Sequence, residues 1–105
     1  MTKYLLGYHG GSMPQTPEEG AKVMAAWNSW MGQLGSKIVE PGNPTGRAMS
    51  IASNGSVSEG GGANPLTGYS LIEAASLDEA VQLASSCPQL MAGGSVEVCE
   101  IVNVM

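Results

Sequence analysis

Basic side chains are scarce in this chain of 105 residues. The chain has four Lys or Arg and nine Asp or Glu residues, which gives a formal net charge of -5 and a pI near 4.5. A protein with this balance repels nucleic-acid phosphates and anionic lipid headgroups. We therefore expect neither nucleic acid nor a membrane surface among its partners.

Cysteine and histidine are scarce as well. The two cysteines, Cys87 and Cys99, form no CxxC pair, and a single histidine could join them, which argues against a zinc site. We interpret both as packed thiols, while a disulfide between them stays open for an oxidising compartment. No phosphate-binding loop, dinucleotide fingerprint or GxSxG elbow is present, so we expect no nucleotide cofactor and no Ser-His-Asp catalysis. With one histidine and one aspartate, we expect no metal site either.

Long apolar runs are missing as well. The run Tyr4-Leu5-Leu6 stops at Gly7, short of the roughly 7 to 15 apolar residues of a signal peptide, and no segment approaches the roughly 20 of a membrane span. We expect a cytoplasmic protein. With 43% hydrophobic and 12% charged residues, the chain has the material for one globular domain over residues 1–105.

Two segments carry the signature of a helix start. Thr16-Pro17-Glu18-Glu19 and Ser76-Leu77-Asp78-Glu79 are capping boxes, in which a hydroxyl and a carboxylate satisfy free backbone N–H groups. The first helix is predicted to end at Gly35 and the second near Ser86, because Pro88 prevents much continuation. The apolar stripe of the first helix comprises Val23, Trp27, Trp30, Met31 and Leu34.

Extended segments alternate with these helices. Strands are predicted over 3–8, 37–40, 68–74 and 96–102, and Asn54-Gly55 predicts a hairpin with a type I′ turn. This order is the β-α-β-β-α-β plan of an α+β, ferredoxin-like fold with an extra hairpin. Two helices cover only one face of such a sheet, so we expect a homodimer in which a second copy covers the other face.

The second half of the chain resembles a known family. The motif G-Y-S-L-I-E-A over residues 68–74 leads into S-L-D-E-A, then Cys87-Pro88 and a G-S-V-E-V strand. These residues resemble the YCII-related family (YciI-like, including its DGPF-type members), although the D-G-P-F signature is absent and residues 41–66 match poorly. The resemblance implies a dimeric α+β barrel with a cleft between the sheet and the first helix.

The resemblance also implies action on small aromatic or lactone compounds, for which a histidine on the first helix, paired with an aspartate, is proposed to move protons in some members. In this chain the corresponding helix position falls at or near Met24, and the single aspartate, Asp78, begins a helix. That pair is therefore missing. Any acid–base chemistry would need another group.

His9 is the first candidate for such a group, since it ends a predicted strand beside two glycines. It could act as a general base or bind a ligand, or it could be a loop histidine bonded to backbone. Trp27 and Trp30, one helical turn apart, could wall an aromatic pocket or belong to the core.

A polar cluster is the second candidate. Tyr69 and Glu73 share one face of a predicted strand, and with Glu40 and Arg47 they could form a ligand site, in which the guanidinium would bind a carboxylate. A solvated surface is the alternative.

Two functions follow from these observations. The first is binding of a small organic ligand (aromatic, lactone or carboxylate) in a cleft between the sheet and the first helix, with weak acid–base catalysis through His9. The alternative is a non-catalytic dimeric module for structure or protein interaction. Tight packing of the two indoles would shrink the pocket and favour the alternative.

Overall fold

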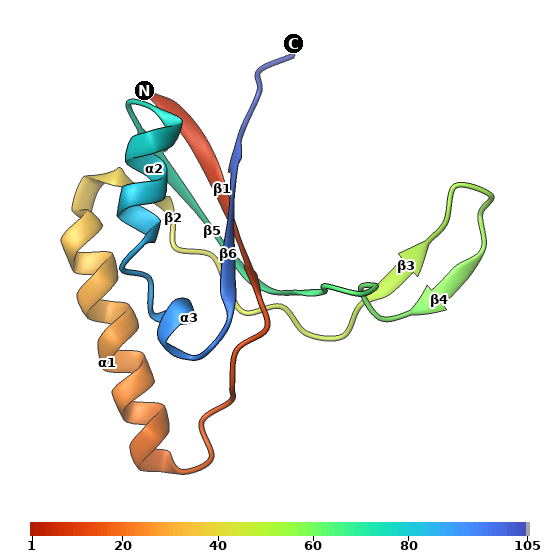
Figure 1. Ribbon diagram of the computed structural model, residues 1–105, viewed down its shortest axis with the longest axis horizontal. Helices are drawn as coiled ribbons and strands as arrows, with labels where there is room; N and C mark the ends of the chain where they lie inside the picture. The colour runs from red at the N-terminus through yellow and green to blue at the C-terminus, as the bar shows by residue number, and fades with distance from the viewer. Residues whose placement is uncertain (105) are drawn as a thin grey trace.

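Figure 1 shows the computed structural model, which describes residues 1–104. Three helices lie on one side of a four-stranded sheet, and a separate two-stranded hairpin projects on the other side. Along the chain the elements are β1 (Thr2–His9), α1 (Pro17–Leu34), the 3-10 turn η1 (Gly35–Lys37), β2 (Ile38–Glu40), β3 (Met49–Ile51), β4 (Val57–Glu59), β5 (Leu66–Ala74), α2 (Leu77–Ala84), α3 (Pro88–Met91) and β6 (Ser95–Glu100).

The main sheet has the strand order β2-β5-β1-β6, and every neighbouring pair is antiparallel. The connection β1-α1-β2 therefore places β5 between its two strands, and β5-α2-β6 places β1 between its own. Two such split β-α-β units are consistent with the predicted ferredoxin-like α+β plan. No helix among the described residues is long and apolar enough to cross a bilayer.

Alternation along β1 decides which side chains meet the helices. Tyr4, Leu6 and Tyr8 are buried on the helix side, opposite Ile72 and Ser70 of β5. They pack with α1 and α2 in one cluster, because successive side chains of a strand point to opposite faces. The remaining buried apolar members of this core are Trp30, Leu34, Ala74, Ala80, Ala84 and Cys87.

Both predicted capping boxes form. The Thr16 hydroxyl accepts the Glu19 amide at 3.1 Å, and the Ser76 hydroxyl accepts the Glu79 amide at 3.1 Å. Each glutamate reaches back to a backbone N–H just before its helix. The second helix ends at Ala84, earlier than predicted, and Pro88 begins the short helix α3 instead of ending helical structure.

The hairpin around Asn54-Gly55 forms, but its predicted turn type is wrong. A type I′ turn needs positive φ at both residues, and only Gly55 has it, with φ 90°. The Gly55 amide instead donates to the Ala52 carbonyl, and the Ala52 amide to the Ser56 carbonyl, both at 2.8 Å. This is the three-residue loop in which a glycine follows a type I turn. The hairpin and its flanking segments, residues 45–64, are called the arm below.

The second face of the main sheet carries no helix within residues 1–104 (Figure 1). This open face presents Leu5, Leu71 and Cys99 at its centre, where the three residues are neighbours in the strand register. Glu73 and Glu97 lie towards its ends. The open face is the surface on which the sequence predicts a second copy.

Candidate functional site

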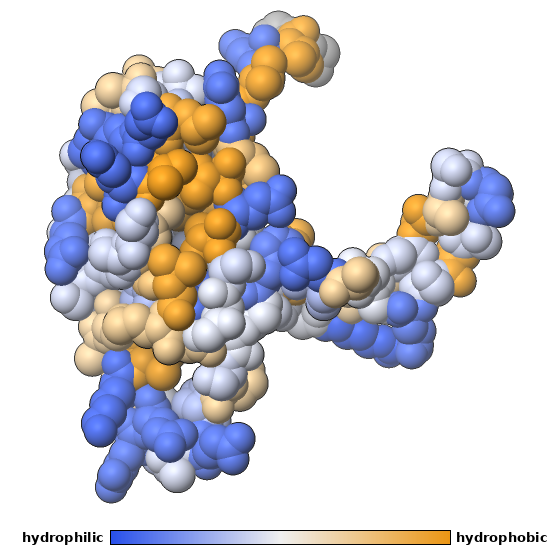
Figure 2. Space-filling model, in the orientation of Figure 1, coloured by the Kyte–Doolittle hydropathy of each residue, from blue (hydrophilic) through white to orange (hydrophobic). Residues whose placement is uncertain are grey.

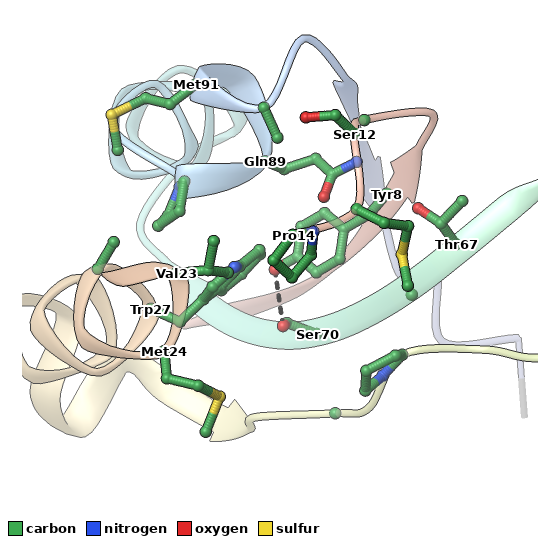
Figure 3. Close-up of a pocket in the computed structure, with 18 of the residues that line it drawn as sticks. Tyr8, Ser12, Pro14, Val23, Met24, Trp27, Thr67, Ser70, Gln89 and Met91 are labelled. Atoms are coloured by element: carbon green, nitrogen blue, oxygen red, sulfur yellow. Dashed lines mark hydrogen bonds between the residues drawn. The ribbon is translucent and has the colours of Figure 1, made fainter. Parts of the chain in front are cut away.

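A cavity of about 910 Å³ lies on the helix side of the sheet. Its walls come from the loop after β1, the N-terminal half of α1, α3, the segment after β2 and the start of β5. Apolar side chains dominate the lining, and Figure 3 shows Met24, Met91 and Val23 around it. Flexible methionines allow such a wall to adapt to ligands of different shape.

Trp27 forms the aromatic wall of this cavity. Its ring meets the Tyr8 ring edge to face, with 5.2 Å between ring centroids, and the Trp30 ring at 5.7 Å. Trp30 lies behind it in the core, 2% exposed, and donates its indole N–H to the Leu83 carbonyl at 3.0 Å. The predicted indole pair is thus divided between the two roles, because Trp27 borders the cavity and Trp30 packs the core.

Two hydroxyls supply a polar point inside the cavity (Figure 3). Tyr8 donates to the Ser70 hydroxyl, which donates to the Pro41 carbonyl, both at 2.7 Å. Desolvation by burial raises the pKa of Tyr8 well above its usual value, and the nearby Cys87 thiol raises it further. Tyr8 therefore keeps its proton at neutral pH and acts as a neutral hydrogen-bonding group, not as a base.

One positive charge lies at the edge of the cavity. Lys22 lines it from the exposed part of α1 and takes part in none of the ion pairs found in residues 1–104. The neighbouring carboxylate, Glu19, accepts the backbone N–H of Gln15 as part of the helix cap. Lys22 is thus a cation with no carboxylate partner beside an apolar cavity.

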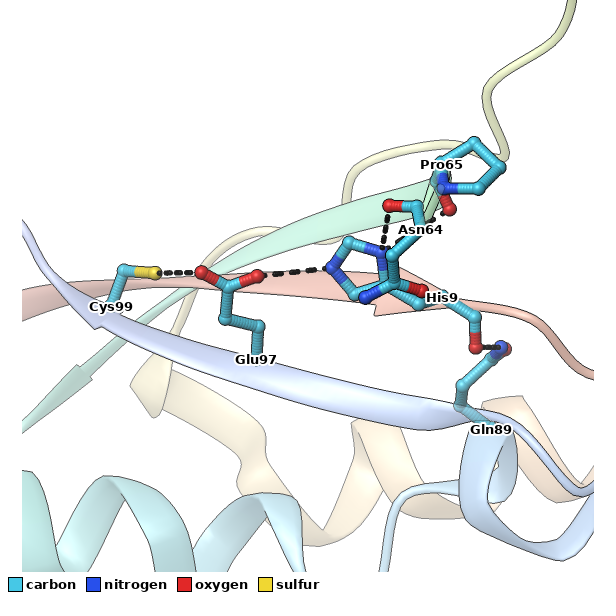
Figure 4. A network of polar contacts seen from close by, with 6 residues as sticks. All are labelled: His9, Asn64, Pro65, Gln89, Glu97 and Cys99. Atoms are coloured by element: carbon cyan, nitrogen blue, oxygen red, sulfur yellow. Dashed lines mark hydrogen bonds and ion pairs between the residues drawn. The ribbon is translucent and has the colours of Figure 1, made fainter. Parts of the chain in front are cut away.

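His9 lies on the other side of the sheet, away from this cavity. It follows Tyr8 in β1, and its side chain belongs to the open face, where it is 7% exposed. Figure 4 shows its ring enclosed by three oxygen atoms: Nδ1 lies 3.0 Å from the Asn64 carbonyl and 3.2 Å from the Pro65 carbonyl, and Nε2 lies 3.1 Å from Glu97. The structure does not place His9 in the predicted cleft.

These contacts determine what His9 can do. Carbonyl oxygens only accept hydrogen bonds, so Nδ1 donates its N–H to the base of the arm. Nε2 is engaged with Glu97 on the open face, so neither ring nitrogen is available as a general base in the cavity. The hydrogen bond from Cys99, followed by that from His9, lowers the pKa of the Glu97 carboxyl.

Cys99 completes this network without becoming reactive. Its thiol donates to Glu97 at 3.4 Å, and desolvation together with that carboxylate raises the pKa of the thiol. Burial also raises the pKa of Cys87. Both thiols are free, Cys87 within the core and Cys99 half-buried, and neither is an activated nucleophile.

The predicted polar cluster does not assemble. Tyr69 donates to Glu40 at 3.0 Å, which raises the pKa of the phenol, but Arg47 pairs with Glu59 inside the arm at 3.1 Å. Glu73 lies opposite Lys3 on the open face. Of these residues only Tyr69 borders the cavity. No group of His, Cys, Asp and Glu within residues 1–104 could hold a metal ion.

Sequence reasoning missed Tyr8, Ser70 and Lys22 as cavity residues. Ser70 had a readable signal, since it occupies an inward position of β5 between Gly68 and Ile72, where a polar residue needs a partner. Nothing in the sequence distinguishes Lys22 from other surface lysines.

No protein-family profile matches the chain, and no curated protein matches it by sequence. Among solved structures, the chain is similar to 5-chloro-2-hydroxyhydroquinone dehydrochlorinase from Burkholderia phenoliruptrix AC1100, determined as a complex with 2,5-dihydroxybenzoquinone. The two share 21% sequence identity over 90% of each chain, with a TM-score of 0.51. At this level of identity, the comparison shows that the two proteins share an α+β fold.

Proposed function

We propose that this protein binds a small aromatic compound bearing a carboxylate or phenolate in the cavity between the sheet and α1. The observation that carries the proposal is the combination of the Trp27 wall with the unpaired Lys22 at one cavity. A flat ring gains most by packing on an indole, and an ammonium attracts the anionic substituent. A hydroxyl of the ligand would then donate to the Tyr8 oxygen, whose own proton is committed to Ser70.

The cavity is large enough for this class of ligand. Small-molecule sites usually enclose about 300 to 1,000 Å³, and the 910 Å³ found here is at the upper end. The solved structure with the same fold was determined as a complex with 2,5-dihydroxybenzoquinone, which, like the proposed ligands, is a flat six-membered ring with oxygen substituents. The proposal concerns binding: His9 faces away from the cavity, and Tyr8 holds its proton at neutral pH.

We also propose that two copies pack sheet to sheet through the open face, as a dimeric α+β barrel of the YCII-related type. Leu5, Leu71 and Cys99 form an apolar centre on this face, and Glu73 and Glu97 lie towards its two ends. This is the pattern of an interface with an apolar core and a polar rim. The interaction module, the second candidate function, is favoured by the exposed apolar side chains of the arm.

Ligand binding can be tested by thermal shift and by fluorescence. A panel of benzoates, phenols and lactones is screened for a raised melting temperature, because a ligand specific for the folded state stabilises it. A Trp30→Phe variant leaves Trp27 as the single indole, and a bound ring changes its emission. We expect both signals from anionic aromatic members of the panel.

Matched variants of α1 then locate the site. Lys22→Gln removes the charge at the cavity, while Glu18→Gln changes one charge on the same helix at a residue outside the lining. We expect Lys22→Gln to weaken binding of the anionic ligands about tenfold, the effect of roughly 1.4 kcal/mol, and Glu18→Gln to leave it unchanged or slightly improved. Equal effects of the two variants, or no response of Trp27, would contradict the proposal.

A further inference from the structure

The arm has one apolar face and one polar face. In the β3–β4 register, Met49 lies opposite Glu59 and Ile51 opposite Val57, while Ser50 lies opposite Ser58. The apolar side chains are exposed to 53%, 74% and 58% for Met49, Ile51 and Val57. A two-stranded hairpin alone is marginally stable in water, so this apolar face requires a covering surface that residues 1–104 do not supply.

The arm is nevertheless held firmly at its base. The Thr45 amide donates to the Thr67 carbonyl at 3.0 Å, and the Tyr69 amide donates to the Asn43 carbonyl at 3.2 Å. On the returning segment, the His9 ring binds the carbonyls of Asn64 and Pro65. The direction of the arm is therefore fixed by the sheet, which lowers the entropy lost when the arm binds a partner.

That direction is away from the helices. Figure 1 shows the arm projecting from the sheet on the side of the open face, and Figure 2 shows a wide hollow between the arm and the C-terminal segment. The molecule extends 43 × 43 × 18 Å. A body placed on the open face would lie in this hollow with the arm along its flank.

The exposed surface area indicates how much surface this chain has available for a partner to cover. A compact monomer of this mass exposes about 5,500 Å², whereas this chain exposes 7064 Å². The surplus of about 1,500 Å² exceeds the roughly 800 Å² that each partner contributes to a standard interface, and it falls in the range of obligate dimers. The radius of gyration, 15.1 Å, likewise exceeds the roughly 13 Å expected for this length.

We propose that the arm clasps a second copy of this chain, packing Met49, Ile51 and Val57 against the flank of a partner seated on the open face. In a twofold dimer each chain offers one open face and one arm, so both surfaces are covered at once. Charge on the arm does not oppose this partner: the charged residues of the arm are Arg47 and Glu59, which pair, so a neutral arm meets a body of net charge -5 without added repulsion. The inference rests on the sheet-to-sheet dimer proposed above.

The test compares both faces of the arm by sedimentation. Ile51→Glu places a charge on the apolar face, and the control Ser58→Glu places the same charge on the polar face of the same hairpin. Leu71→Glu disrupts the open face. We expect the wild type and Ser58→Glu to dimerise alike, Ile51→Glu to weaken dimerisation at least tenfold, and Leu71→Glu to give monomers.

The outcomes separate the two proposals. If Leu71→Glu dissociates the dimer while Ile51→Glu behaves as Ser58→Glu does, the clasp is refuted and the sheet-to-sheet dimer stands. A wild type that stays monomeric at all concentrations refutes both. Because Ile51 is 74% exposed, its replacement removes no core contact, and circular dichroism verifies folding.

A spectroscopic measurement addresses the contact itself. Mixed dimers of chains with labelled methionine methyls and unlabelled chains reveal contacts between copies by nuclear Overhauser effects. We expect intermolecular effects from the Met49 methyl. Their absence in a stable dimer would overturn the clasp.

Discussion

Replacing His9 by alanine separates a structural histidine from a catalytic one. The ring is buried, and its Nδ1–H serves the carbonyls of Asn64 and Pro65 at the base of the arm. Those carbonyls lie in an exposed segment where water can replace the ring, and Glu97 is solvated, so we count only the Nδ1 hydrogen bonding and the buried ring. Together these amount to about 2 kcal/mol.

For a domain of this length, that loss lowers the melting temperature by about 10 °C. Amide exchange provides the local measurement: the amides of Thr45 and Tyr69, which close the base of the arm, should exchange faster in His9→Ala. Tyr69→Phe is the control, because it removes one exposed hydrogen bond and keeps the ring. A melting temperature within about 2 °C of the wild type, with unchanged exchange at both amides, would refute the structural role of His9.

Three further predictions follow. Gly42→Ala should destabilise the protein by at least about 2 kcal/mol in urea unfolding, because its φ is +76° and a Cβ would collide with a backbone carbonyl of β5, whereas Gly46→Ala, with open space around it, should be nearly neutral. In the Leu71→Glu variant, whose open face is not covered by a second copy, a maleimide should label Cys99 before Cys87, which is 1% exposed, and mass spectrometry showing the reverse order would contradict the assigned burial. Lys37 donates a hydrogen bond to Glu79 at 2.9 Å, which lowers the pKa of the Glu79 carboxyl. The stability that this ion pair contributes is therefore present above the unfolded-state pKa and is lost as pH falls through the folded-state pKa. Glu79→Gln should flatten this acid limb of a plot of unfolding free energy against pH.

Local chemistry made the helices predictable from the sequence. A capping box depends on residues within one turn, so Thr16 and Ser76 were identified from their neighbours alone, and so was the end of α1 at Gly35. The turn at Asn54-Gly55 was only half predictable. The same pair suits several loops, and the choice depends on backbone pairing across the hairpin that the sequence does not record.

The site was less predictable, because it depends on which face each strand buries. The alternation of Tyr4, Leu6 and Tyr8 places His9 on the opposite face, whereas its position at a strand end favoured the cleft. The position of Arg47 outside the polar cluster could not be predicted, because the sequence does not show that residues 45–64 project away from the main sheet. The separate roles of Trp27 and Trp30 could not be predicted from the sequence, because two residues of the same apolar stripe can face different surroundings, one the cavity and the other the core.

The arm also bears on how this molecule can change over evolutionary time. It is an insertion between two strands that pair with each other, β2 and β5, and its neck is closed by the bridge between Pro44 and Gly68. The entropic free-energy cost of closing a loop rises slowly with its length, by about 0.6 kcal/mol for each doubling of the number of residues. Lengthening, trimming or rewriting the arm therefore leaves the register of the sheet intact. If the arm binds a partner and the cavity a ligand, as proposed, the two properties depend on separate stretches of the chain, and selection can alter the first while the cavity is kept.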